Sequence, residues 1–177
     1  MEKSLLFIGK FDLNLLNLEQ TILNLSINST NDKNYVKILK DDVNICSILP
    51  DVIKFTIKGY NSVIWVIIGD VKPTLLLKEL ISKANIILLT FNLNDPTTLT
   101  FLNEGWGPIF DRIKSPYSND QKRFLIGTIK NSEISQEILG QIEPTFTHFK
   151  CDKYFEYDIK NSEYHLQSDP EKNLVAY

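Results

Sequence analysis

The stretch 85–91, Asn85-Ile86-Ile87-Leu88-Leu89-Thr90-Phe91, decides the fold class of this chain. It is apolar at nearly every position, which is typical of a strand that a sheet buries on both faces. A helical spacing of leucines and isoleucine precedes it, opened by Pro73, and a second helical pattern begins near Thr98. A buried strand between two helices predicts part of a mostly parallel sheet.

Apolar runs of the same kind occur on both sides of this unit. Strands of this type are expected over 5–8, 62–68 and 123–127, and a last strand is expected within 146–159, centred on 154–157. Residues 52–58 alternate apolar and polar side chains and lead through the turn Gly59-Tyr60-Asn61 into the run 62–68. This pattern predicts a β-hairpin whose first strand lies at an edge of the sheet.

Helices are expected between these strands, over 15–25, 73–81, 98–113 and 134–142, with a weak helical pattern over 161–177. Gly105-Trp106-Gly107-Pro108 must interrupt or kink the third of them. Apart from a possible short strand at 35–39, residues 27–50 are interpreted as loop. The expected fold is a single α/β domain over 1–177, with a mostly parallel six-stranded sheet, one antiparallel edge strand and helices on both faces.

Composition excludes several classes of protein. The formal net charge is -3, without a basic block, so nucleic acid is not expected as a partner. The two cysteines, Cys46 and Cys151, lie far apart and predict neither a disulfide framework nor a metal site. No signal peptide, membrane span or lipid anchor is indicated. We therefore expect an intracellular protein without direct membrane insertion.

The order of the expected elements resembles that of the Ras superfamily of small GTPases. Four phrases strengthen the resemblance: 91–99 is similar to "YDvTdpxSf", 64–69 to "iWDxxG", 124–128 to "llvGNK" and 154–160 to "yfEtSAK". The resemblance covers residues 4 to about 160. It implies a Ras-like P-loop NTPase fold and a nucleotide site at the family's motif positions.

The phosphate-loop position departs from the family pattern GxxxxGK[ST], whose lysine and hydroxyl hold phosphates and Mg²⁺. Gly9 matches the first glycine, but the last three positions are Asn14, Leu15 and Leu16. The leucines supply neither charge nor a metal ligand. Lys10 could approach a phosphate from an unusual direction, although a solvated loop lysine is the favoured interpretation.

The other motifs depart in the same way. Val66 stands where the DxxG motif has its Mg²⁺-assisting Asp, and only Gly69 remains of that motif. Thr128-Ile129-Lys130-Asn131 replaces NKxD and lacks the carboxylate that accepts from guanine, while Asp158 replaces the serine of the last motif. Without these groups, the binding free energy for a nucleotide falls by about 5–10 kcal/mol, whereas nanomolar affinity corresponds to about 12 kcal/mol.

We therefore expect a non-catalytic pseudo-GTPase that works as a protein–protein interaction module or a structural subunit. It would need no cofactor, its partners would be other protein subunits, and it would be cytoplasmic or held at an organelle or cilium by its complex. One alternative is a divergent small GTPase that still binds GTP or GDP with Mg²⁺ as a switch. Another is a flavodoxin-like protein with a small molecule at the carboxyl ends of its strands.

Two aromatic residues are candidates for contact with a partner, Trp106 and Phe110. Trp106 lies between two glycines, so its indole is either a core residue or an exposed anchor, and tryptophan is enriched at interface hot spots. His148, His165 and Cys151 belong to no spaced cluster with other ligands or nucleophiles, so ordinary structural roles are expected for them.

Overall fold

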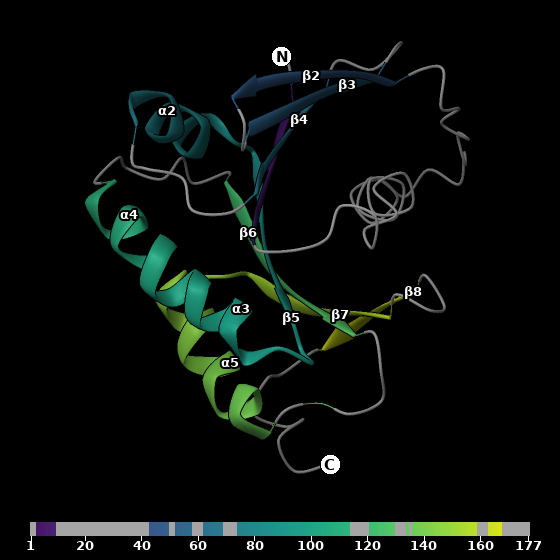
Figure 1. The fold of residues 1–177 in the computed structure, drawn as a ribbon, viewed down its shortest axis with the longest axis vertical. Helices are drawn as coiled ribbons and strands as arrows, with labels where there is room; N and C mark the ends of the chain where they lie inside the picture. Colours follow the sequence, from purple (N-terminus) through teal and green to yellow (C-terminus); the bar gives the residue numbers. More distant parts are fainter. Residues whose placement is uncertain are drawn as a thin grey trace.

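The computed structural model describes residues 3–9, 43–49, 52–57, 62–68, 74–113, 121–129, 134, 136–158 and 163–167. These residues form one mixed β-sheet, and the described helices all lie on the same side of it, on the left in Figure 1. The protein is therefore an α/β protein, as the sequence predicted.

Eight strands form the sheet: β1 (Lys3–Gly9), β2 (Val43–Leu49), β3 (Val52–Ile57), β4 (Ser62–Ile68), β5 (Ile86–Asn92), β6 (Lys122–Ile129), β7 (Lys153–Asp158) and β8 (Glu163–Gln167). Their order is β2-β3-β4-β1-β5-β6-β7-β8. The five central strands are parallel to one another: β4, β1, β5, β6 and β7. The flanking strands β2, β3 and β8 are each antiparallel to their neighbours.

The five parallel strands follow a doubly wound order. Numbered along the chain, they lie in the order 2-1-3-4-5, because the chain passes from β1 to β4 on one side and continues with β5 on the other. The position between β1 and β5 is thus the topological switch point, beside which α/β proteins of this type bind their ligands at the carboxyl ends of the strands.

Two expectations about the sheet were wrong. It has eight strands and not six, and β3 is not an edge strand, because β2 pairs with it on its outer side. Glu163–Gln167 forms β8 where the pattern over 161–177 suggested a helix. The sequence patterns did not predict β2 and β8. Each of these strands gains its hydrogen bonds from a neighbouring strand, and such tertiary pairing overrides weak local patterns. The helix expected over 15–25 and the strand expected at 35–39 lie outside the described residues.

Two of the described helices begin at polar caps. The Thr74 hydroxyl accepts a hydrogen bond from the Leu77 N–H, 3.2 Å away, at the start of α2 (Leu75–Lys83). The Asp95 carboxylate accepts from the Thr97 N–H at the start of α3 (Pro96–Thr100). These hydroxyl and carboxylate oxygens satisfy N–H groups that a helix cannot pair internally. The last described helix is α5 (Gln136–His148).

The segment that was expected to interrupt or kink its helix forms a wider, π-helical turn. Helix α3 continues into the π-helical η2 (Phe101–Trp106) and then α4 (Gly107–Arg112). The Gly107 N–H donates to the Leu102 carbonyl, five residues earlier, while Pro108 has no N–H to donate. The helical segment therefore passes the proline without ending.

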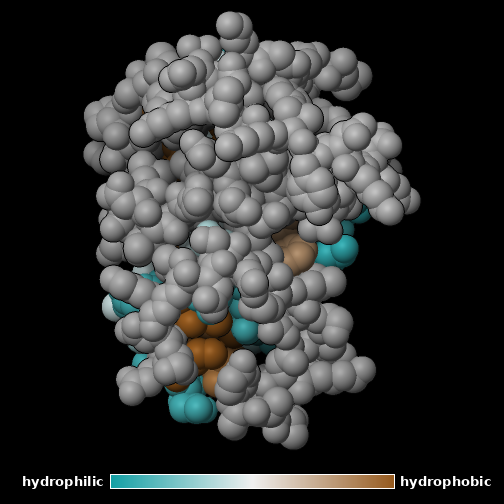
Figure 2. Space-filling model, turned by 90° about the vertical axis from the view of Figure 1, so that its right-hand side faces the viewer, coloured by the Kyte–Doolittle hydropathy of each residue, from teal (hydrophilic) through white to brown (hydrophobic). Residues whose placement is uncertain are grey.

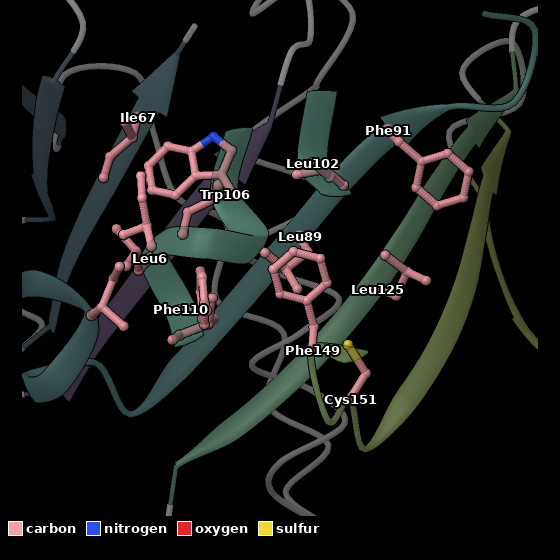
Figure 3. Packing of buried hydrophobic residues seen from close by; sticks show 14 of the residues in the cluster. Leu6, Ile67, Leu89, Phe91, Leu102, Trp106, Phe110, Leu125, Phe149 and Cys151 are labelled. Carbon is pink, nitrogen blue, oxygen red and sulfur yellow. The ribbon is translucent and has the colours of Figure 1, made fainter. Parts of the chain in front are cut away.

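The main hydrophobic core lies between the sheet and these helices. Leu6, Leu89 and Leu125 point toward the helices from three neighbouring strands, as Figure 3 shows, and each is fully buried. Phe7 and Leu88 alternate with them and are also fully buried on the opposite face. Figure 2 views the molecule from that opposite side and shows strongly apolar atoms in its lower half beside hydrophilic ones. Both faces of the parallel strands are thus apolar, as buried parallel sheets require.

Candidate functional site

The carboxyl ends of the parallel strands bring several of the motif positions to one edge of the sheet. Thr128 is level with Asn92 on β5, and Ile129 is level with Asp158 on β7. Gly9 is the last residue of β1, which lies two strands from β6 in the sheet. This edge, which includes the switch point between β1 and β5, is the candidate site.

The structure brings together only part of the predicted set. Gly9, Val66, Thr128, Ile129 and Asp158 are described. Six of the motif positions lie outside the described residues: Lys10, Asn14, Leu15, Leu16, Gly69 and Asn131.

Gly9 has a packing role at the switch point. A Cβ atom at this position would collide with the hydroxyl and carbonyl oxygens of Thr90 on β5. The Thr90 hydroxyl is buried and donates to the carbonyl of Ile8, 3.2 Å away. Only glycine lets β1 lie this close to Thr90, so the glycine is explained without a phosphate.

Val66 presents only methyl groups where the related motif has a carboxylate. It lies two residues before the end of β4, level with Phe7 on β1, and its exposed fraction is 0%. An isopropyl group has no lone pair for a metal ion, and its burial stabilises the fold by about 1.5–3 kcal/mol. The position is therefore part of the hydrophobic face of the sheet.

Thr128 uses its hydroxyl inside the fold. The hydroxyl donates to the Phe91 carbonyl, 3.0 Å away, and the Thr128 carbonyl accepts from the Leu93 N–H at 2.9 Å. Both bonds join the ends of β5 and β6. Ile129, the next residue, is half-buried and packs against the main core. These two positions thus hold neighbouring strands together, while Asp158 is half-buried at the end of β7.

The polar residues after β5 form a local network of turn and cap. The Asp95 carboxylate accepts from the Thr97 hydroxyl at 2.7 Å as well as from its N–H at 3.0 Å. The Thr98 hydroxyl donates to the Asp95 carbonyl at 2.7 Å and accepts from the Asn92 N–H at 2.9 Å. These bonds explain why 92–98 is rich in Asn, Asp and Thr, because such side chains replace backbone partners in turns and caps.

Trp106 and Phe110 belong to the core, so the structure corrects their proposed contact with a partner. Their exposed fractions are 1% and 3%, and Figure 3 shows the indole among Leu6, Ile67 and Leu102. The π-helical turn that ends at Trp106 directs it toward the sheet. Of the two interpretations left open for Trp106, the core one agrees with the structure.

The opposite, amino edge of the sheet holds a buried guanidinium that sequence reasoning missed. Arg123 lies at the start of β6, and its Nη1 donates to the Phe149 carbonyl at 2.8 Å. Its Nε and Nη2 donate to Gln121 Oε1 at 3.2 and 3.1 Å, and its Cζ lies 5.1 Å from the Phe110 ring centre. Arginine is rare in this chain, and that rarity was the one sequence feature that could have drawn attention to Arg123. These bonds give Arg123 a structural role.

Cys151 is not a nucleophile in this setting. Burial raises the pKa of its thiol to about 12, partly offset by the nearby Arg123 charge. The thiol is therefore protonated at neutral pH, and the thiolate is the reactive form. This agrees with the ordinary role expected for it.

His148 joins two helices. Its Nε2 lies 3.3 Å from Asp111 Oδ1 on α4, and its ring stacks on Phe149 with 5.1 Å between ring centres. A Cβ at Gly107 would lie 3.1 Å from His148 Cε1, so the glycine makes room for the imidazole. The contacts are those of a packing residue. The side chain of His165 lies outside the described residues.

Within the described ranges, no group of three or more His, Cys, Asp or Glu side chains is placed to hold a metal ion. No helix in that part of the chain has the length and apolar character needed to cross a membrane. Comparison with protein-family models gives no match, and comparison with curated proteins gives no matching relative.

Proposed function

We propose that this chain is a Ras-like domain without nucleotide chemistry, which serves as a protein–protein interaction module or a structural subunit of a larger complex. The observation that carries the proposal is the use of motif positions inside the fold. Val66 is apolar and fully buried, and the Thr128 hydroxyl is bonded to the Phe91 carbonyl. The Val66 side chain therefore offers no ligand atom to a magnesium ion, and the Thr128 hydroxyl already donates its proton inside the fold.

The fold class supports the Ras-like part of the proposal. The five parallel strands have a doubly wound order, and the hairpin of β3 and β4 lies next to β1. Segment 91–99, which resembles a phrase of the small GTPases, leaves the carboxyl end of β5 and opens α3. A switch point at the carboxyl edge is where a nucleotide would sit in such a sheet.

The direct test is to denature the purified chain and to identify any small molecules that it releases. The proposal predicts no guanine nucleotide in the released fraction. It also predicts that Mg²⁺ with GTP does not raise the melting temperature, because a ligand raises it only by binding to the folded state. Stoichiometric GTP or GDP in the released fraction would replace the proposal with the divergent GTPase.

The flavodoxin-like alternative rests on a specific observation, since the order 2-1-3-4-5 is also that of flavodoxin-like proteins, which hold FMN at this switch point. A yellow preparation that releases flavin on denaturation would favour this alternative.

A further inference from the structure

Helices α2 and α4 enclose a small groove on the helical side of the molecule. Its volume is about 200 Å³, and it is lined by Thr74, Leu77, Lys78, Ile109, Arg112 and Ile113. Leu77, Ile109 and Ile113 are buried and form an apolar floor. The two cationic side chains belong to exposed residues, one on each helix.

The charges around the groove are not balanced by the described acidic residues. Glu79 follows Lys78 along α2, but its carboxylate pairs with Lys83 at 3.2 Å. Asp111 precedes Arg112, but its Oδ1 lies 3.3 Å from His148 Nε2 and the carboxylate forms no ion pair with Arg112. Among the described residues, no carboxylate lies within 4.0 Å of Lys78 or Arg112. The described residues thus give this groove a cationic rim, although the net charge of the whole chain is -3.

An exposed leucine extends the apolar surface beside this rim. Leu75 is 77% exposed and lies three residues before Lys78 on α2. Side chains three apart on a helix are surface neighbours, so Leu75 lies beside the Lys78 side chain. A single exposed leucine is ordinary, but this one adjoins both a cation and an apolar groove.

The volume of the groove favours a side chain of a bound protein segment over a small molecule. Sites for small molecules and cofactors enclose roughly 300–1,000 Å³, which is more than this groove offers. One or two apolar side chains of a bound segment would fill it. The cationic rim favours a segment with carboxylates beside those side chains, because complementary charges set specificity and steer association.

We propose that this groove docks an acidic segment of a partner protein, with a large apolar side chain on Leu77, Ile109 and Ile113 and carboxylates on Lys78 and Arg112. Leu75 contacts a second apolar residue of the same segment. This inference deepens the proposed function and rests on it, since it names the surface and the chemistry of the partner.

The test uses a phage-displayed library of random peptides, selected on the full-length chain. Enriched peptides should place Asp or Glu beside a large apolar residue. One enriched peptide, labelled with fluorescein, is then titrated by fluorescence anisotropy. The double variant Lys78→Glu with Arg112→Glu should weaken its binding by about tenfold or more, since two ion pairs become repulsions. Leu75→Asp should also weaken it.

The matched control is Lys122→Glu with Lys153→Glu, which changes the net charge equally at exposed positions on β6 and β7, outside the groove. It should leave the affinity within about twofold, because exposed charges act weakly beyond a Debye length. All these positions are exposed, so thermal melting should confirm that each variant folds.

Three results would overturn the inference: no enriched peptide, enrichment without acidic residues, or equal losses in the groove variant and its control. The small-molecule analysis of the same preparation keeps the two proposals separate. No nucleotide and no peptide binding would remove the groove assignment alone. Bound nucleotide with groove-dependent peptide binding would remove the proposed function and leave the groove assigned.

Discussion

Restoring the missing carboxylate by Val66→Asp tests whether that position can still serve a metal ion. Val66 is fully buried and level with Phe7 on the neighbouring strand. If the position only packs against the sheet face, an aspartate there is a buried acid without a partner. If it lines a competent nucleotide site, the aspartate gains a magnesium ion and becomes stabilising.

The magnitude follows from burial. Loss of the valine side chain removes about 1.5–3 kcal/mol. A buried aspartate without a partner takes up a proton, and because its unfolded pKa is about 3.9, doing so at pH 7 costs about 4 kcal/mol. The sum, about 6 kcal/mol, is a large part of the roughly 5–15 kcal/mol that stabilises an ordinary domain.

The sign of the pH dependence is fixed by the raised pKa in the folded state. The folded variant keeps its proton while the unfolded chain loses it, so stability falls as the pH rises above about 4. The slope is about 1.4 kcal/mol per pH unit. The variant should therefore lose about 3 kcal/mol more at pH 7 than at pH 5, relative to the parent chain.

Urea denaturation followed by tryptophan fluorescence measures these free energies of unfolding at both pH values. Val66→Thr is the control, since a buried hydroxyl costs about 1–3 kcal/mol and does not titrate. A Val66→Asp chain that loses less than about 2 kcal/mol at pH 7, or that Mg²⁺ with GTP restores, would refute the reasoning about this position.

Three further predictions concern the core and the amino edge. Trp106→Ala should reduce the free energy of unfolding by about 3–5 kcal/mol in urea, because it empties a buried site, whereas an exposed anchor would lose less than about 0.5 kcal/mol. Arg123→Met should reduce the free energy of unfolding by about 1.5–3 kcal/mol in the same assay, because the Phe149 carbonyl and the Gln121 side chain lose their donor. An unchanged urea midpoint would contradict the structural role. The Cys151 thiol should react with a thiol reagent at pH 8 no faster than the chain opens, because burial raises its pKa to about 12, and rapid labelling of the folded Cys46→Ser variant would contradict this.

The candidate site was predictable only in part. The ends of the buried strands can be located in the sequence, so the meeting of Thr128, Ile129 and Asp158 at one edge follows from the parallel order. The strand order does not predict which hydrogen bonds and close contacts the residues at this edge make. The contact of Gly9 with Thr90 and that of Thr128 with Phe91 each join residues of different strands, more than thirty positions apart along the chain.

The sequence by itself determined the five parallel strands and the α/β class. A strand buried on both faces must be apolar at almost every position, and that requirement is visible in a run such as 85–91. It also determined that Pro108 disturbs its helix, because proline has no N–H to donate.

Only the tertiary structure decided the edges of the sheet, the burial of Trp106 and the position of the groove. Strands β2 and β8 exist through hydrogen bonds to β3 and β7, and an edge strand has no strict apolar pattern of its own. Likewise, the groove combines side chains of α2 and α4, and neither cation at its rim pairs with a carboxylate of the described residues. Such properties belong to pairs of segments, so a single segment of sequence does not carry them.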